Sequence, residues 1–297
     1  MTGVILLDKP EHTTSFRALA QVRRIFGEKK AGHTGTLDPM ASGLLPVMLG
    51  GATKFIELLP SHDKAYRAVF LLGADTDTLD ITGKVLRQRY VSARETDVRE
   101  ALAAFRGTIF QTPPMYSAVS QNGVRLYALA RQGIEVPRQA RRVEIFRLDL
   151  VGADDVKGEY MIDVHCSAGT YIRSLVSDLG EALGCGAVLT ALRRTMAHGL
   201  RVEDACTPDV LAALAPTDAA AKVIPVDRLL ETYPAVTVTE NQSARFCHGG
   251  ALDAGRVRGL CGDGLYRVYA PDGRFLGLGS FGADAGELAV RRLLIET

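Results

Sequence analysis

The chain has 297 residues, of which 47% are hydrophobic and 23% charged, a composition typical of a globular rather than a disordered protein. Lysine and arginine total 35 against 34 aspartate and glutamate residues, so the average charge neither indicates nor excludes a nucleic-acid partner, which needs only a local basic face. No apolar stretch approaches the roughly 20 residues of a membrane span, and the five cysteines form no CxxC pair. We therefore expect a cytoplasmic protein with no membrane partner and no structural zinc site.

Helices and strands alternate irregularly along the first 231 residues. Residues 15–26 carry apolar side chains at helical spacing, with Ser15 as a candidate N-cap and Gly27 as a stop. The turn GADTDTLDITG is expected to join a strand over 64–72 to a second strand near 84–89. The other elements expected here are strands over 3–7, 141–151 and 159–166, helices over 96–105 and 171–183, and a helix-bearing connector over 203–225.

The order of these elements indicates the fold class. Strand pairs are joined by short turns rather than by repeated helical crossovers, which favours an α+β fold with a mixed or antiparallel central sheet and flanking helices. After about residue 232, glycines recur among short apolar runs, a pattern typical of short strands with tight turns. We predict a larger domain over 1–231 and a small β-rich domain over 232–297.

The segment 32–46, GHTGTLDPMASGLLP, is the candidate for chemistry. Its three glycines and two prolines exclude a long regular element, while apolar runs on both sides anchor it. A constrained loop that displays one carboxylate and one imidazole, Asp38 and His33, is a common way to present catalytic residues. Two other interpretations stay open on the pattern alone. One is a structural turn in which Asp38 caps a following helix; the other is a phosphate-binding loop, which lacks the GxxxxGK[ST] pattern.

This loop and most of the chain resemble a known family. GHTGTLDPMASGLLP is similar to the signature of the TruB family, the bacterial tRNA pseudouridine-55 synthases. One departure is His12, where the family usually has glycine, and it leaves the conformation of this turn open. The other similar segments are GVILLDKP, KAYRAVF, GADTDTLDITG, FRGTIFQTPPMYSAVSQNGVRLYALARQGIEVPRQAR, CSAGTYIRSLVSDLGEALGCGAVLTALRRT and DGRFLGLG.

The resemblance implies an enzyme that isomerises a uridine of tRNA to pseudouridine, with the pseudouridine synthase fold and a PUA-like C-terminal domain. It assigns Asp38 as the nucleophile, Arg173 as its ion-pair partner that lowers the pKa of the carboxyl, and Tyr66 as the ring that stacks on the target base and serves proton transfer. Because isomerisation imports no group and has no redox step, no cofactor and no metal are expected. The residues implied for substrate binding are His33, Tyr66, Tyr171, Leu192, Asp80 (as a second acidic partner of Arg173), Arg141 and Arg142.

The implied partner is tRNA, recognised at its T stem-loop with the base at position 55 flipped out and His33 filling the vacated space. No protein partner is implied. Residues 111–142 combine arginines with tyrosines, which suits single-stranded RNA, and they resemble the thumb that covers the RNA in the family; an ordinary solvated helix is the competing interpretation. Two other functions stay open for the chain: a non-catalytic tRNA-binding or folding factor on the same scaffold, and an N-glycosidase that releases free uracil.

Overall fold

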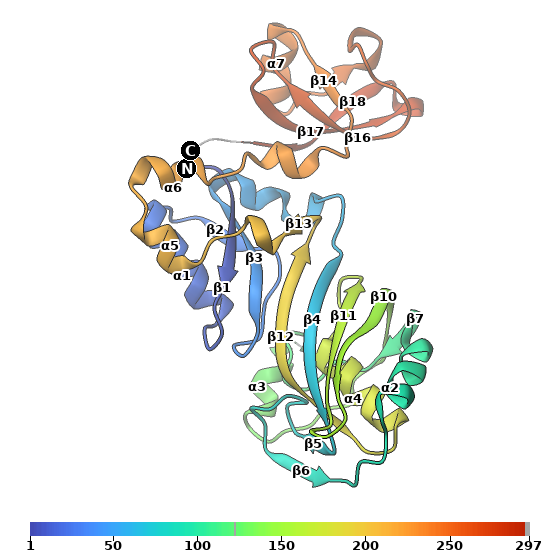
Figure 1. The fold of residues 1–297 in the computed structure, drawn as a ribbon. Coiled ribbons are helices and arrows are strands. Elements are labelled where there is room, and N and C mark those ends of the chain that lie inside the picture. Colours follow the sequence, from blue (N-terminus) through green and yellow to red (C-terminus); the bar gives the residue numbers. More distant parts are fainter. Residues whose placement is uncertain (122, 295–297) are drawn as a thin grey trace.

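The computed structural model describes residues 1–121 and 123–294, and it contains two larger sheets (Figure 1). A long sheet flanked by helices is built from the first part of the chain, and a smaller sheet built from the C-terminal part lies at one end of it. The helices are α1 Ser15–Phe26, α2 Glu95–Ala101, α3 Leu126–Ala130, α4 Ile172–Ala182, α5 Pro208–Ala213, α6 Pro216–Ala221 and α7 Glu240–Cys247.

The long sheet has nine strands in the order β1-β3-β12-β4-β11-β10-β7, with β2 added to β3 and β13 added to β12. Neighbouring strands are antiparallel except β3 and β12, which run parallel. The predicted α+β class with a mixed central sheet is confirmed. The strands are β1 Gly3–Lys9, β2 Ala31–His33, β3 Ser42–Leu49, β4 Lys64–Leu72, β7 Gly107–Gln111, β10 Arg141–Asp154, β11 Glu159–Cys166, β12 Ala187–Ala197 and β13 Leu200–Arg201.

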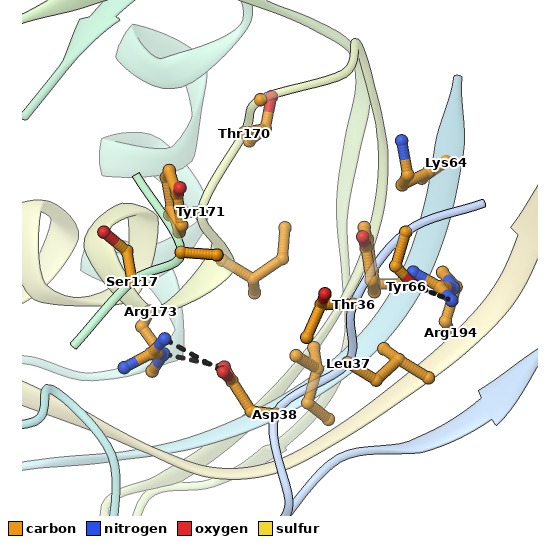
Figure 2. Close-up of a pocket in the computed structure, with 15 residues that line it drawn as sticks. Thr36, Leu37, Asp38, Lys64, Tyr66, Ser117, Thr170, Tyr171, Arg173 and Arg194 are labelled. Atoms are coloured by element: carbon orange, nitrogen blue, oxygen red, sulfur yellow. Dashed lines mark hydrogen bonds and ion pairs between the residues drawn. The ribbon is translucent and has the colours of Figure 1, made fainter. Parts of the chain in front are cut away.

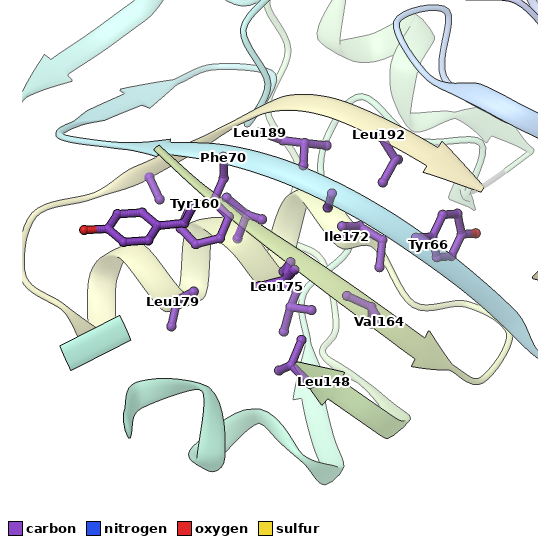
Figure 3. Packing of buried hydrophobic residues seen from close by; sticks show 14 of the residues in the cluster. Tyr66, Phe70, Leu148, Tyr160, Val164, Ile172, Leu175, Leu179, Leu189 and Leu192 are labelled. Atoms are coloured by element: carbon purple, nitrogen blue, oxygen red, sulfur yellow. The ribbon is translucent and has the colours of Figure 1, made fainter. Parts of the chain in front are cut away.

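Helix α4 packs on one face of this sheet and forms its largest core. Buried and more exposed residues alternate along β4 and β11, so each strand turns every second side chain toward the helix. Phe70 and Tyr160 stack there with ring centroids 5.6 Å apart, and Leu175 and Leu179 of α4 lie against the same face (Figure 3). Burying each such side chain contributes about 1.5–3 kcal/mol. The same cluster continues to Tyr66, so the core also supports the region around the candidate loop.

The start of α1 differs from the prediction in one respect. The helix covers the predicted residues 15–26, and Gly27 ends it in the left-handed conformation with φ 61°. The N-cap is Thr14, whose hydroxyl accepts a hydrogen bond from Arg17 N at 3.1 Å. The assignment of Ser15 as the cap is therefore wrong, because the Ser15 side chain turns inward and is 2% exposed.

The second strand predicted after β4 is present, with a different neighbour. A strand forms near the expected place, β6 Val85–Gln88, but it pairs with the short strand β5 Ala74–Thr76 instead of β4. Strand β4 has no free edge for it, since β11 and β12 occupy both sides. The helix predicted over 96–105 divides into α2 and a 3₁₀ turn over Leu102–Phe105, and the one predicted over 171–183 is α4.

His12 adopts a left-handed backbone with φ 59°, in a turn after β1. Glycine adopts this conformation without steric cost, whereas an L-residue is strained in it. The turn therefore keeps the conformation that a glycine would favour, at the expense of local strain.

The C-terminal residues form a five-stranded sheet in the order β14-β16-β17-β18-β15, which confirms the β-rich prediction. Sequence reasoning missed α7, although Thr239 and Gln242 supply a capping box: the Gln242 side chain accepts from Thr239 N at 2.9 Å. The strands are β14 Ala235–Thr237, β15 Leu252–Asp253, β16 Gly264–Tyr269, β17 Phe275–Gly282 and β18 Glu287–Leu293.

The two sheets share buried residues. Phe275 of β17 packs against Phe55, with ring centroids 5.9 Å apart, inside a cluster that also holds Leu6 of β1. The Tyr233 hydroxyl donates to the Leu58 carbonyl at 3.1 Å. The division into domains 1–231 and 232–297 stays a proposal. Residues on both sides of this boundary belong to one buried cluster.

Candidate active site

Distant parts of the chain hold the loop that carries Asp38. The loop runs from β2 to β3, so the next element after Asp38 is a strand and the helix-cap interpretation is wrong. Ser15 Oγ accepts from Leu37 N at 2.8 Å and donates to Leu37 O at 3.1 Å. Arg194 Nη2 donates to the Gly35 carbonyl at 3.1 Å. The main chain just before Asp38 is therefore fixed at two places.

Arg173 holds the Asp38 carboxylate with two nitrogens. Its Nε lies 2.9 Å from Oδ2 and its Nη2 donates to Oδ1 at 3.1 Å, a two-point arrangement that a planar guanidinium can make and an ammonium cannot (Figure 2). Arg173 is the second residue of α4, and its side chain is 5% exposed. The predicted pair of Asp38 and Arg173 is present in the structure.

The remaining nitrogen contacts of Arg173 tie three segments together. Nη1 donates to the Thr78 carbonyl at 3.0 Å, and Nη2 donates to the Tyr116 carbonyl at 2.8 Å. Asp80 Oδ2 lies 3.9 Å from Nη1, so Asp80 is a second acidic neighbour of Arg173 rather than a wall of the pocket. These contacts orient the guanidinium before any substrate arrives.

Burial raises the pKa of Asp38 above its ordinary value of 3.8, and this effect outweighs the opposing influence of Arg173. Asp80 also raises the pKa of Asp38, whereas Lys9 lowers it. The expectation that Arg173 would leave the carboxyl with a lowered pKa is therefore reversed. The Asp38 side chain is still 31% exposed to the cavity, and a base that displaced water there would strengthen the upward shift of its pKa.

A cavity of about 280 Å³ opens beside the carboxylate. Asp38 and Arg173 lie on one side of it, and Tyr66 and Arg194 lie on the other (Figure 2). Its apolar surface includes the predicted pocket residues Leu192 and Tyr171. The full lining is Gly35, Thr36, Leu37, Asp38, Lys64, Tyr66, Ser117, Ala118, Gly169, Thr170, Tyr171, Ile172, Arg173, Leu192 and Arg194.

Tyr66 presents a ring in the central strand β4 and is 8% exposed. Burial raises the pKa of Tyr66 to about 12, although Arg194 acts against this shift. The phenol is therefore neutral at physiological pH, and its ring and hydroxyl both belong to the lining of the cavity.

Four predicted substrate residues do not line the cavity. Asp80 lies behind Arg173, and His33 ends β2, where burial lowers the pKa of its imidazole. Arg141 and Arg142 begin β10 and are exposed, opposite Gln111 and Phe110 of β7.

Sequence reasoning missed three basic residues at the site. Lys64 and Arg194 line the cavity, and Lys9 lies close enough to Asp38 to influence its pKa while being 0% exposed. Arg194 is almost fully buried, with 1% of its surface exposed. Arg193 and Arg194 point to opposite faces of β12. Which of them faces the cavity depends on how β12 pairs with β4, and the sequence alone does not show that pairing.

In the ranges 1–121 and 123–294, no three His, Cys, Asp or Glu side chains are grouped so as to hold a metal ion. No helix in the described part of the chain is long and apolar enough to cross a membrane.

Three family models match successive parts of the chain. The TruB family pseudouridylate synthase (N terminal domain) matches residues 23–172, the tRNA pseudouridylate synthase B C-terminal domain matches 173–231, and the pseudouridine synthase II TruB C-terminal domain matches 234–294.

Curated relatives are similar over nearly the whole length. The tRNA pseudouridine synthase B of Burkholderia mallei (strain NCTC 10247) is 46% identical, with 99% of this chain and 97% of that protein covered. The protein of the same name from Thiobacillus denitrificans (strain ATCC 25259 / T1) is 47% identical, with coverage of 98% and 95%. A chain in the crystal structure of a Cbf5–Nop10–Gar1 complex superposes with a TM-score of 0.74 at 26% identity, covering 99% of this chain and 85% of that one.

Proposed function

The chain belongs to the TruB family of pseudouridylate synthases, and we propose that it converts a uridine in the T-loop of tRNA, position 55, to pseudouridine. The observation that carries the proposal is the Asp38 carboxylate, held at two points by Arg173 at the edge of a cavity that also contains Tyr66. The arrangement suits a reaction at one base, with no second substrate to accommodate.

The reaction breaks the N1–C1′ bond, rotates the base and joins C5 to C1′. Asp38 is the proposed nucleophile, because its carboxylate is oriented by Arg173 and opens onto the cavity. The flat ring of Tyr66 and the apolar side chain of Leu192 line the cavity and offer a surface on which the freed base can turn without leaving. C5 then loses its proton and N1 gains one, and Tyr66, whose side chain lines this part of the cavity, is assigned to this proton transfer. The atoms of substrate and product are the same, so the chemistry needs no co-reactant.

The base must leave its stack to reach Asp38, which costs a few kcal/mol. We assign His33, at the end of β2, to the space that the flipped base leaves in the T-loop. Arg141 and Arg142 are exposed at the base of the thumb, residues 111–142, and are assigned to phosphate contacts. They would position the RNA without taking part in the reaction.

Tritium release tests this function. A tRNA transcript labelled with [5-³H]uridine loses tritium to water when C5 is bonded to C1′, and mapping of the product locates the modified base. We expect release of one tritium per tRNA at position 55 and none from a transcript with cytidine there. Binding without tritium release would identify a tRNA-binding factor, and free uracil would identify an N-glycosidase; either result contradicts the proposal.

A further inference from the structure

Arg194 has the largest fully buried side chain of the described residues, and in that part of the chain no acidic side chain neutralises its charge. Its Nε donates to the Leu44 carbonyl at 2.6 Å and its Nη2 to the Gly35 carbonyl at 3.1 Å. Across the ranges 1–121 and 123–294, no carboxylate oxygen lies within 4.0 Å of its guanidinium. A buried charge without a counter-ion is unfavourable for folding, so its presence in a pocket points to a use in function.

The neighbours of Arg194 place its charge at one end of the cavity. Arg194 of β12 is the direct cross-strand partner of Tyr66 of β4, so both side chains lie on the same face of the sheet. Burial lowers the pKa values of Lys9, Lys64 and His33, and the charge of Arg194 lowers them further. At the other end, Arg173 already faces Asp38 and Asp80.

The proposed reaction creates a negative charge on the base, and a positive charge at the Arg194 end of the cavity would stabilise it. Written for attack of Asp38 on C1′, a C1′–O bond forms as the N1–C1′ bond breaks, and the electron pair stays on the uracil. That charge is shared by N1, O2 and O4. When C5 later bonds to C1′, the C1′–O bond breaks and returns its electron pair to Asp38; C5 then loses its proton and N1 gains one, so the atoms of substrate and product are the same. Charge that develops in a water-poor pocket is stabilised best by groups already oriented toward it.

We infer that Arg194, which has no carboxylate partner among the described residues, stabilises with its charge, beside the Tyr66 ring, the uracil anion released on cleavage of the N1–C1′ bond. This inference rests on the proposed function. It adds an electrostatic role at the opposite end of the pocket from the Asp38–Arg173 pair.

The first test varies the charge of the residue and the basicity of the leaving base together. Arg194→Gln is compared with wild type in single turnover on tRNA carrying uridine or 5-fluorouridine at the target position. The rate compared is that of N1–C1′ cleavage and rejoining through C5, because 5-fluorouridine has no C5 proton to lose. Fluorine withdraws electrons and stabilises the departing base anion without help from the protein. The rate with 5-fluorouridine should therefore depend less on the charge of Arg194 than the rate with uridine. We expect a loss of roughly 100- to 1,000-fold with uridine and a loss about tenfold smaller with 5-fluorouridine, with little change in tRNA binding. Equal losses with both bases would overturn the inference, because a purely structural defect slows both alike.

Arg67→Gln is the matched control. Arg67 follows Tyr66 on β4 but pairs with Asp163 on the opposite face, at 2.8 Å, and its side chain is 53% exposed. This substitution removes one arginine from β4, the strand that carries Tyr66, and it does not alter the lining of the cavity. Both substrates should therefore react at the wild-type rate.

Arg194→Lys keeps the inference testable if the glutamine variant does not fold. A lysine at this position keeps the charge but titrates, and burial lowers its pKa. Because Lys9, Lys64 and Tyr66 titrate in both proteins, the variant is compared with wild type at each pH. The inference expects a loss of rate at alkaline pH that wild type does not show; parallel profiles contradict it. A wild-type protein inactive on uridine-containing tRNA would instead refute the proposed function.

Discussion

Two opposing influences act on the ionisation of the Asp38 side chain. Burial favours the neutral acid, and the guanidinium of Arg173 favours the carboxylate. Burial prevails, so the enzyme holds a carboxyl that ionises less readily than a free aspartate. A less stabilised anion is a stronger nucleophile, provided that the working pH lies above its pKa.

This balance gives the pH dependence of the chemical step. In the proposed reaction the reacting species is the Asp38 carboxylate, so the single-turnover rate should fall as the pH is lowered through the pKa of Asp38, and this fall should occur above the ordinary value of 3.8. The rate is measured with pre-folded tRNA, and circular dichroism at each pH verifies that the protein stays folded. A rate that holds constant down to about pH 4 would contradict the raised pKa.

His12 gives a test of backbone strain. A left-handed L-residue is strained by about 1–2 kcal/mol, and glycine loses part of that gain through the entropy of the unfolded chain. His12→Gly should therefore raise the free energy of unfolding by about 0.5 kcal/mol in chemical denaturation. His12→Ala is the control, since it removes the exposed imidazole but keeps the Cβ atom. If His12→Ala stabilises as much as His12→Gly, the effect comes from the side chain and not from φ.

At the scale of elements, α1 connects the fold to the chemistry. Two neighbouring hydroxyl residues at its start have different roles. Thr14 caps the helix, and Ser15 hydrogen-bonds both the backbone N–H and the backbone carbonyl of Leu37. The two side chains are similar in chemistry and adjacent in sequence. They can therefore be used to separate helix stability from loop position.

Removing each hydroxyl should affect different properties. Ser15→Ala leaves a buried N–H and C=O without partners, so we expect a loss of stability of about 1–3 kcal/mol and a slower chemical step at saturating tRNA. Thr14→Ala removes a helix cap and should cost about 1 kcal/mol with an unchanged rate. Denaturant unfolding and single-turnover rates measure the two effects. If the rate of Ser15→Ala matches that of Thr14→Ala, the clamp does not position Asp38.

Local signals explain how much of the fold and site could be predicted. The limits of α1 and β4 followed from apolar spacing and from Gly27, and the glycines and prolines around Asp38 identified the loop. The rest depends on long-range packing. The pairing of β6 with β5, the inward turn of Ser15 and the burial of Arg194 are decided by which strands and loops lie beside them.

On the scale of the whole molecule, the shared core between the two sheets should make them unfold together. Phe275 is 9% exposed and packs on Phe55 across the junction. Phe275→Ala should lower the free energy of unfolding by about 3–5 kcal/mol, in one cooperative transition seen by probes in both sheets. Val156→Ala, at a residue that is 98% exposed, should change little. Two separate transitions in the wild-type protein would show that the sheets are independent.

The shared core also changes what a truncation would reveal. Deletion of the chain after about residue 232 removes Phe275 and Leu278 from a cluster that includes residues of β1 and β3. Loss of turnover in such a fragment would therefore report damage to the fold as well as loss of RNA contacts. Point variants on the surface of the C-terminal sheet are better suited to separate gripping from catalysis.

The central claim, that Asp38 is the nucleophile of a uridine isomerase, is tested most directly by Asp38→Asn in single turnover. Asparagine keeps the size of the side chain and an oxygen for Arg173 but removes the charge. We expect tRNA binding to stay within about threefold of wild type, which is less than 1 kcal/mol, while pseudouridine at position 55 falls to background. Appreciable pseudouridine formation by this variant, verified free of wild-type protein, would contradict the account.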